Sequence, residues 1–211
     1  MTLDVLDLGR RPFSAVWTLQ KATAAKRAKG ECPDTLYFVE HEPVYTRGTS
    51  GRKGIKPNLP FPVYDIERGG DVTFHGPGQL VGYPIIHLRQ RGLLVGAYLR
   101  RLEAVLIDAL RAVGVSGEAV QGKTGVWVGE KKIASIGVAV KGWVTYHGFS
   151  LNVGGDLSPF SAVRPCGFDP SVVASVESLT GRKTSISEMK ERVKASFAKF
   201  FIQTEEASCI P

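Results

Sequence analysis

The chain has 211 residues, of which 43% are hydrophobic and 22% are charged. At about 150 residues per domain this length predicts a single domain, and the composition is that of a globular protein rather than of a disordered chain. Lys and Arg outnumber Asp and Glu by 27 to 20, so the net charge of +7 predicts an acidic partner: nucleic acid, a membrane surface or an acidic protein. The three cysteines, Cys32, Cys166 and Cys209, are too few and too scattered for a disulfide framework or a CxxC metal site.

The start of the chain alternates apolar and polar side chains and carries Asp4 and Asp7. That alternation is typical of a strand, and it differs from both a secretory signal and an Arg- and Ser-rich transit peptide. The apolar runs elsewhere are far shorter than the roughly 18 residues of a membrane span. We therefore expect a soluble, cytoplasmic domain without a membrane partner.

The N-terminal half predicts one helix and three strands. Pro12 suits the first turn of a helix that runs to Lys29, with Val16, Leu19 and Thr23 along one face. Aromatic and apolar density predicts strands over 34–42, 63–67 and 79–88. Between them lie a long loop over 47–62, of a kind that often has a function, and a Gly-rich segment over 68–78.

The C-terminal half has the most regular helix, over 93–113, where apolar residues recur every three or four positions before Gly114. Runs over 124–128, 132–140 and 143–153 predict an antiparallel meander. Ser185 and Glu188 form a capping-box pattern that opens a last helix through Phe200. The whole pattern predicts one α+β domain over residues 1–211, with a mostly antiparallel or mixed sheet flanked by helices, and not the regular alternation of a Rossmann fold.

The segment richest in chemical groups is Arg68-Gly-Gly-Asp-Val-Thr-Phe-His75-Gly-Pro-Gly-Gln79. Its glycines allow sharp turns that expose backbone N–H groups, while Arg68 adds a positive charge, Thr73 a hydroxyl and His75 an imidazole. A hairpin connection whose Arg and His only cap carbonyls is the alternative, but this density of polar groups favours a site. The pattern is neither a GxxxxGK[ST] phosphate loop nor a GxGxxG motif.

Lys132 stands at the start of a predicted strand. Counting by twos, it shares a face with Ala134 and Ile136, and this apolar face is predicted to point into the core. A partly buried lysine is a candidate for acid–base chemistry, although a lysine that snorkels from a strand edge is the commoner case.

Cys166 lies between Pro165 and Gly167, in a turn that could present its thiol. A free cysteine is more often a small buried hydrophobe. The presence of Lys132, His75 and His147 in a chain with only 4 histidines favours a reactive thiol.

Together these segments resemble the octanoyltransferases of lipoate biosynthesis, the lipoyl(octanoyl) transferases. The resemblance covers essentially the whole chain, from Trp17 and Gln20 to Pro165-Cys166-Gly167. Its motifs are Glu40 to Thr46, the RGGxxTxH signature from Arg68 to His75 with Gly78, Gln79 and Tyr83 after it, Lys132 to Gly137, and His147 to Asn152. One departure is Ser150, where Ala is more usual.

The resemblance implies a fold like the catalytic domain of biotin and lipoate protein ligases. It also implies a reaction, in which an octanoyl group moves from acyl carrier protein to a lysine of the lipoyl domains of 2-oxo acid dehydrogenases or of the glycine-cleavage H protein. Acyl carrier proteins are acidic. Of the partners that the net charge allows, an acidic protein is therefore the one that this reaction favours. Arg47, Arg52, Lys53 and Lys56 are then the first candidates for a docking face.

The resemblance further implies a Cys–Lys dyad without ATP or a metal. Cys166 would be the nucleophile that forms an acyl-thioester intermediate, and Lys132 would lower the pKa of its thiol. Carried over residue by residue, the substrate-binding positions are Arg68, Gly69, Gly70, Asp71, Val72, Thr73, Phe74, His75, Ser135, Ile136, Gly137, Gly148, Phe149 and Ser150. We expect His147 to line the site.

Three other interpretations remain open. An ATP-dependent lipoate or biotin ligase on the same fold would need no cysteine, and the chain lacks an Arg-rich adenylate loop. A nucleic-acid-binding module would explain the charge, but the basic residues are scattered and form no known motif. A zinc site of His75, His147 and Cys166 has no local ligand spacing to support it.

Overall fold

The computed structural model describes residues 2–51, 59–163 and 170–202. Within them, a seven-stranded sheet has the order β1-β2-β6-β10-β9-β8-β7, and a second, three-stranded sheet has the order β4-β3-β5. The strands are β1 (Leu3–Arg11), β2 (Asp34–His41), β3 (Val44–Arg47), β4 (Val63–Asp65), β5 (Val72–His75), β6 (Gln79–Ile85), β7 (Glu118–Val120), β8 (Lys123–Val128), β9 (Lys131–Lys141) and β10 (Val144–Asn152). The helices are α1 (Phe13–Ala28), α2 (Val95–Arg111), α3 (Val176–Thr180) and α4 (Ile186–Phe201).

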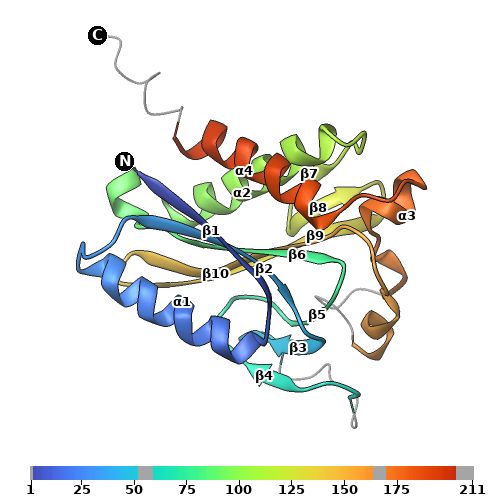
Figure 1. Cartoon of the computed structure of the whole chain (residues 1–211), viewed down its shortest axis with the longest axis horizontal. Coiled ribbons are helices and arrows are strands. Elements are labelled where there is room, and N and C mark those ends of the chain that lie inside the picture. Colours follow the sequence, from blue (N-terminus) through green and yellow to red (C-terminus); the bar gives the residue numbers. More distant parts are fainter. Residues whose placement is uncertain (1, 52–58, 164–169, 203–211) are drawn as a thin grey trace.

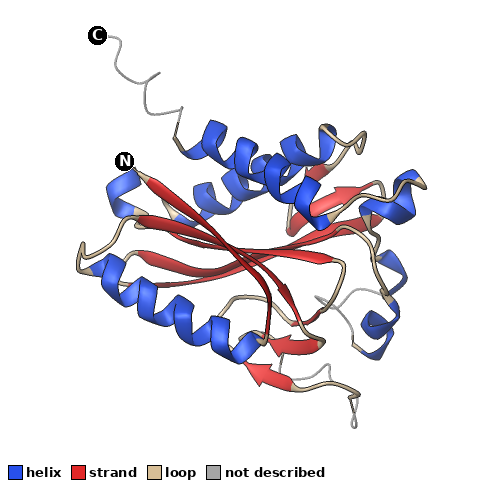
Figure 2. Cartoon of the chain, viewed as in Figure 1, coloured by secondary structure: helices blue, strands red, loops and turns tan. Residues whose placement is uncertain are grey.

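The helices lie on both faces of the large sheet. Helices α2 and α4 cover one face, while α1 and the small sheet lie on the other (Figure 1; Figure 2 shows the same layers by element type). The pair β1–β2 is parallel and joined through α1, whereas the pairs from β2 to β7 across the sheet are antiparallel. This is the predicted mixed, mostly antiparallel α+β sheet, and the predicted meander is β8–β9–β10.

The main core lies between the sheet and helices α2 and α4. The buried face of α4 carries Met189, Val193 and Phe197, as the 3.6-residue period predicts. The helix starts where predicted, because Ser185 Oγ accepts a hydrogen bond from the Glu188 backbone N–H at 3.0 Å. In the part of the chain that the structure describes, no helix is long and apolar enough to cross a lipid bilayer.

Four short elements depart from the predicted ones. Strands β3 and β7 and helix α3 occupy segments for which we predicted no helix or strand, and β5 occupies part of the predicted Gly-rich segment. Strand β5 (Val72–His75) lies inside the Gly-rich segment, where only pairing with β3 across the second sheet makes it extended. That partner is distant in sequence, so no local pattern announces it.

Helix α1 buries Val16 and Thr23 as predicted, but not Leu19. Leu19 is 37% exposed, whereas Gln20 and Arg27 are fully or nearly buried. Arg27 is buried because its guanidinium Nε donates to Asp34 Oδ1 at 2.6 Å. The buried face of α1 therefore combines the apolar Phe13, Val16 and Ala24 with the polar Gln20, Thr23 and Arg27.

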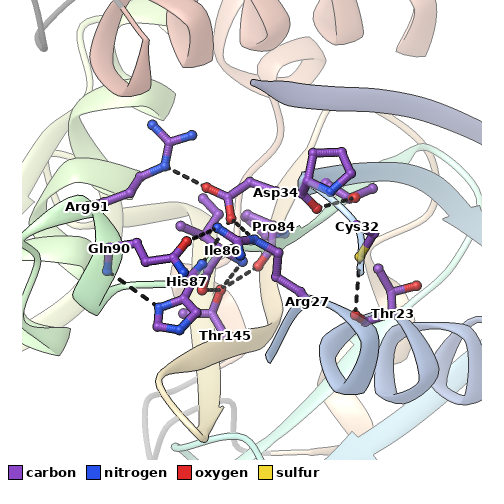
Figure 3. Close-up of polar contacts among 12 residues, drawn as sticks. Thr23, Arg27, Cys32, Asp34, Pro84, Ile86, His87, Gln90, Arg91 and Thr145 are labelled. Atoms are coloured by element: carbon purple, nitrogen blue, oxygen red, sulfur yellow. Dashed lines mark hydrogen bonds and ion pairs between the residues drawn. The ribbon is translucent and has the colours of Figure 1, made fainter. Parts of the chain in front are cut away.

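A buried ion cluster joins the ends of several elements (Figure 3). Asp34, at the start of β2 and 1% exposed, accepts hydrogen bonds from Arg27 Nε and Arg91 Nε, both at 2.6 Å, and from the His87 backbone N–H at 3.0 Å. Arg91 Nη1 also donates to the Phe201 carbonyl, at the end of α4. One carboxylate thus ties α1 and β2 to the turn before α2 and, through Arg91, to α4.

Candidate active site

A cavity of about 50 Å³, partly open to solvent, lies where β9 and β10 of the large sheet meet β5 and the loop before it. Its walls combine apolar side chains, glycine backbone and a few polar groups, as in small-molecule sites. The predicted residues that line it are Arg68, Gly69, Gly70, Asp71, Val72, Thr73, His75, Ser135, Ile136, Gly137, His147, Gly148, Phe149 and Ser150. The structure thus brings together three segments far apart in sequence.

Strand register explains why these segments meet. In the β9–β10 pair, Ser135 lies opposite Ser150 and Gly137 lies opposite Gly148. The Arg68–Gly70 loop then closes over β9, because the Gly69 backbone N–H donates to the Val138 carbonyl at 3.0 Å. A Cβ at Gly137 would lie 2.9 Å from Arg68 Cδ and 3.0 Å from the Gly69 carbonyl oxygen, so this close approach requires glycine.

Arg68 is held by backbone and hydroxyl groups of the cavity wall. Its Nη2 donates to the Thr46 carbonyl at 2.9 Å and to Thr46 Oγ1 at 3.2 Å, and its Nη1 donates to the Gly69 carbonyl at 3.0 Å. Arg68 is 8% exposed, so its guanidinium places a fixed positive charge beside the cavity.

Two neutral histidines lie at the cavity: His75 lines it, and the ring of His41 lies 6.0 Å from the ring of His75. His75 Nδ1 donates to Gln79 Oε1 at 2.6 Å, and burial lowers the pKa of His75 to about 3. His41 Nδ1 donates to the Arg11 carbonyl, its Nε2 accepts from the Tyr83 hydroxyl at 2.8 Å, and burial lowers its pKa to about 4. At neutral pH neither ring adds a positive charge to the site.

Two residues that the sequence did not suggest for the site, Phe13 and Ile66, also line the cavity, together with Val81 and Tyr83. Val81 and Tyr83 lie two apart on β6, on the same face as Gln79, so the strand period offers a signal for them. Phe13 and Ile66 carry no such signal, because each reaches the cavity only through tertiary packing.

Phe74 does not line this cavity. On β5 its side chain lies opposite to those of Thr73 and His75 and packs with Tyr45 and Phe160, whose ring centroids lie 5.4 and 5.6 Å from its own. Among the predicted substrate-binding residues, Phe74 is therefore one that the structure does not bring to this cavity. The strand period of two turns it into the core of the small sheet.

Lys132 lines a neighbouring cavity that shares Gly69, Gly70, Ile136 and Gly137 with the first one. As predicted it is buried, with 5% of its surface exposed, and its Nζ lies 5.5 Å from the centroid of the Trp127 ring. The strict alternation predicted for β9 fails next to it, because a bulge against β8 lets both Ile133 and Ala134 enter the core.

Cys166 lies outside the described residues, as do Arg52, Lys53, Lys56 and Cys209. The described residues on either side of 164–169 lie near both cavities. Val163 packs with Val72 in the small-sheet core, and Val173 pairs with Lys132, whose carbonyl accepts from the Ala174 backbone N–H at 3.0 Å.

Within the described residues, no group of three His, Cys, Asp or Glu side chains is arranged to hold a metal ion. His75 and His147 both line the cavity, but His75 Nδ1 is bonded to Gln79 and His147 Nε2 to Glu67. Cys32, which the structure does describe, is half-buried outside the cavity, and burial raises the pKa of its thiol. Cys166, the third member of the zinc site considered above, lies outside the described residues.

Comparison with known proteins places the chain in a family. Residues 12–198 match the family model of the lipoyl protein ligase A/B catalytic domain. The chain is 45% identical over 196 residues to an octanoyltransferase of Geobacter sulfurreducens, covering 93% of this chain and 83% of that protein. It is 47% identical over 191 residues to an octanoyltransferase of Pelobacter propionicus, covering 90% and 91% of the two chains.

Solved structures share the fold at low sequence identity. A putative lipoate protein ligase of Thermoplasma acidophilum with bound lipoic acid superposes with a TM-score of 0.75 at 19% identity, over 95% of this chain and 86% of that one. The biotin protein ligase of Aquifex aeolicus superposes with a TM-score of 0.59 at 14% identity, over 98% and 73%. The cavity-lining motifs and these matches agree: the chain belongs to the lipoyl protein ligase A/B catalytic domain family, and within it to the octanoyltransferases, which are acyltransferases of lipoate biosynthesis.

Proposed function

We propose that the chain moves an octanoyl group from the phosphopantetheine thioester of acyl carrier protein to a lysine of a lipoyl domain, through a thioester on Cys166. The acceptors would be the lipoyl domains of 2-oxo acid dehydrogenases and the glycine-cleavage H protein. The observation that carries the proposal is the pair of adjoining cavities, one with an apolar wall and the other lined by the buried Lys132. An eight-carbon chain gains about 0.8 kcal/mol for each CH₂ group that it buries against such a wall.

In the first step, the Cys166 thiolate attacks the octanoyl carbonyl carbon. The new C–S bond forms, the bond to the pantetheine sulfur breaks, and the Lys132 ammonium gives a proton to the departing thiolate. A free thiol with a pKa of about 8.5 is mostly protonated near neutrality, so a neighbouring ammonium would favour the reactive form.

In the second step, the acceptor amine attacks the enzyme thioester. The C–N bond forms, the C–S bond breaks, and the Cys166 thiolate is regenerated while Lys132, now neutral, takes one proton from the nitrogen. The thioester is already activated, so the proposed reaction consumes no ATP and requires no metal ion.

Intact-mass spectrometry tests the intermediate. Incubation with octanoyl–acyl carrier protein should add the mass of one octanoyl group to the wild type and to Cys32→Ala, and nothing to Cys166→Ala. Normal turnover of Cys166→Ala would overturn the nucleophile assignment. Release of pyrophosphate from ATP and free octanoate would instead favour the ligase reaction.

The role of Lys132 is tested by thiol alkylation against pH. Lys132→Ala should shift iodoacetamide labelling of Cys166 to higher pH, because the thiolate loses its ammonium neighbour. Lys131→Ala is the matched control, since Lys131 is exposed and its Nζ donates to the Ser171 carbonyl at 2.8 Å. Identical pH profiles for the two variants would contradict the assignment.

A further inference from the structure

Glu103 is a buried carboxylate of helix α2 that the two proposed reaction steps do not use. It is 1% exposed, and its neighbours on the buried face of the helix include Leu102 and Leu106. A carboxylate in such surroundings is costly unless specific partners replace its lost hydration. The partners of its two oxygens therefore indicate what this side chain does.

The buried contact of Glu103 is with the backbone of β8. Its Oε1 accepts a hydrogen bond from the Gly125 backbone N–H at 3.0 Å, while its Oε2 forms an ion pair at 2.6 Å with Arg100, whose side chain is half exposed. Strand β8 shifts register against both β7 and β9 around this point, and among the described strands neither register gives Gly125 a partner residue. Glu103 thus supplies the acceptor that the sheet does not offer to this N–H.

Gly125 in turn lies against the side chain of Lys132. A Cβ at Gly125 would clash with the Ala134 carbonyl oxygen and would lie 2.9 Å from Lys132 Cε, and the φ of Gly125 is +128°, so this position requires glycine. The Lys132 backbone pairs with Trp127, two residues further along β8. The lysine side chain therefore lies across β8, with the Gly125 backbone in contact with the carbon that carries the ammonium.

Helix α2 borders the cavity that Lys132 lines. Val95 and Leu99 are part of the cavity wall, and Glu103 follows Leu99 by one helical turn on the same face. Glu103 itself is one step removed from the wall, because the β8 backbone and the lysine stem stand between them. It is placed to act on Lys132 and not on a substrate.

We propose that Glu103 is a positioning residue for Lys132. By holding the Gly125 N–H it fixes the backbone of β8 against the lysine stem, and so sets the place of the ammonium in the cavity. This inference rests on the proposed function, in which one ammonium both favours the Cys166 thiolate and passes protons in the two steps. Such tasks are sensitive to misplacements of about 1 Å. Glu103 itself forms no bond to the substrate and transfers no proton.

Two substitutions separate the hydrogen bond from the charge. Glu103→Met keeps most of the side-chain volume but has no strong acceptor, whereas Glu103→Gln keeps an acceptor oxygen and loses the charge. We expect Glu103→Met to lower the maximal rate of octanoyl-enzyme formation about tenfold, with the KM for octanoyl–acyl carrier protein within about twofold. Glu103→Gln should recover most of that rate.

The matched control is Asp108→Asn, also on α2. Asp108 accepts from Lys199 Nζ of α4 at 2.7 Å, so its loss weakens the packing of the helix at a different contact. It should leave the rate of octanoyl-enzyme formation unchanged.

Dependence on Lys132 is the result that a purely structural role would not give. In iodoacetamide labelling of Cys166, Glu103→Met should shift the pH profile in the same direction as Lys132→Ala. In the Lys132→Ala background it should add nothing, because the group that it positions is gone. A general loosening of the strand would have the same effect in both backgrounds.

Gly125→Ala tests the same contact from the other side. Its Cβ would displace the lysine stem, so we expect the same loss of rate and the same dependence on Lys132. Gly129→Ala is the matched control, because Gly129 also has a positive φ, of +57°, but a Cβ there would meet open space.

Wild-type rates for Glu103→Met and Gly125→Ala would overturn the proposal, as would equal effects with and without Lys132. Failure of Glu103→Gln to recover the rate would assign the effect to the charge and would overturn the hydrogen-bond role. If Lys132→Ala itself leaves the labelling profile unchanged, the proposed role of Lys132 fails and this inference fails with it. The other results leave the proposed function standing.

Discussion

At the scale of single residues, the site is built around histidines that must stay neutral. His41, His75 and His147 are each less than 9% exposed, and burial lowers the pKa of all three below the ordinary value of 6.5. In the unfolded chain these rings regain the ordinary pKa and bind protons more readily. Acid therefore favours the unfolded state.

The free energy of unfolding should consequently fall as the pH drops from about 6.5 toward about 4. The full stabilisation is present above the pKa that the rings have in the unfolded chain, and it is lost as the pH falls toward their pKa in the folded protein. Each ring contributes up to about 1.4 kcal/mol per pH unit. Urea unfolding at about pH 7.5 and about pH 5 measures this. Carboxylates whose pKa is lowered, such as Asp108, lose their stabilising effect only at lower pH. A free energy of unfolding that is the same at both of these pH values would therefore contradict the prediction.

Gly137→Ala tests the close approach of the Arg68 loop to β9. The new Cβ would lie 2.9 Å from Arg68 Cδ, so the loop must move away from the cavity. We expect formation of the octanoyl-enzyme to slow by about tenfold or more, because misplacements near 1 Å can cost that much, while the fold is retained. Gly96→Ala is the control: it lies on helix α2 with open space around it and should leave the rate unchanged.

Most of the cavity lining could be predicted from sequence because it comes from three contiguous motifs, around Arg68, Ser135 and Gly148. The contacts of His147 could not be predicted from the sequence. They depend on a positive φ inside a strand and on Gln20 and Glu67, which are distant in the chain. Phe74 differs in another way, since it belongs to a predicted motif but its side chain packs with Tyr45 and Phe160 rather than lining the cavity.

At the scale of elements, the cluster around Asp34 connects segments that the sheet hydrogen bonds do not. A buried charge that loses its partners is strongly destabilising, so Asp34→Asn should lower the free energy of unfolding by about 3–5 kcal/mol. Chemical denaturation would measure it. Asp4→Asn on the neighbouring strand is the control, because Asp4 is exposed and should change stability by less than about 0.5 kcal/mol.

Helices α2 and α4 and the meander were predictable because their apolar periods match their burial. In the small sheet only β4 matches a predicted strand, over 63–67, whereas β3 and β5 are 4 residues long and pair only across the fold. Val95 and Leu99 extend the predicted apolar face of α2, yet they line the cavity beside Lys132 rather than the core. Periodicity identifies an apolar face but does not say what covers it.

At the scale of the whole molecule, the net charge of +7 suits an acidic donor protein. Arg47, one of the basic residues expected to dock it, pairs with Asp65, its Nη2 lying 2.6 Å from Oδ2. Part of its charge is thus offset within the chain, and docking has to draw on other basic side chains.

The KM for octanoyl–acyl carrier protein should rise when NaCl increases from about 50 to about 500 mM, because salt screens attraction between the two surfaces. Octanoyl-pantetheine, which lacks the acidic protein, is the control and should keep its KM. Equal salt dependence of both donors would contradict electrostatic docking.

The two edges of the large sheet restrict how the protein substrates can bind. Edge strand β1 has a register shift between Asp7 and Arg10, with Gly9 at a φ of +63°, and its charges pair with Lys190 and Glu40. The other edge, β7, is 3 residues long and is itself shifted in register. Bulged, charged or short edges do not accept an added strand. Under the proposed function we therefore expect a lipoyl domain to be recognised through its side chains rather than by pairing with an edge of the large sheet, and blocking the backbone N–H groups of its own edge strands should leave octanoylation intact.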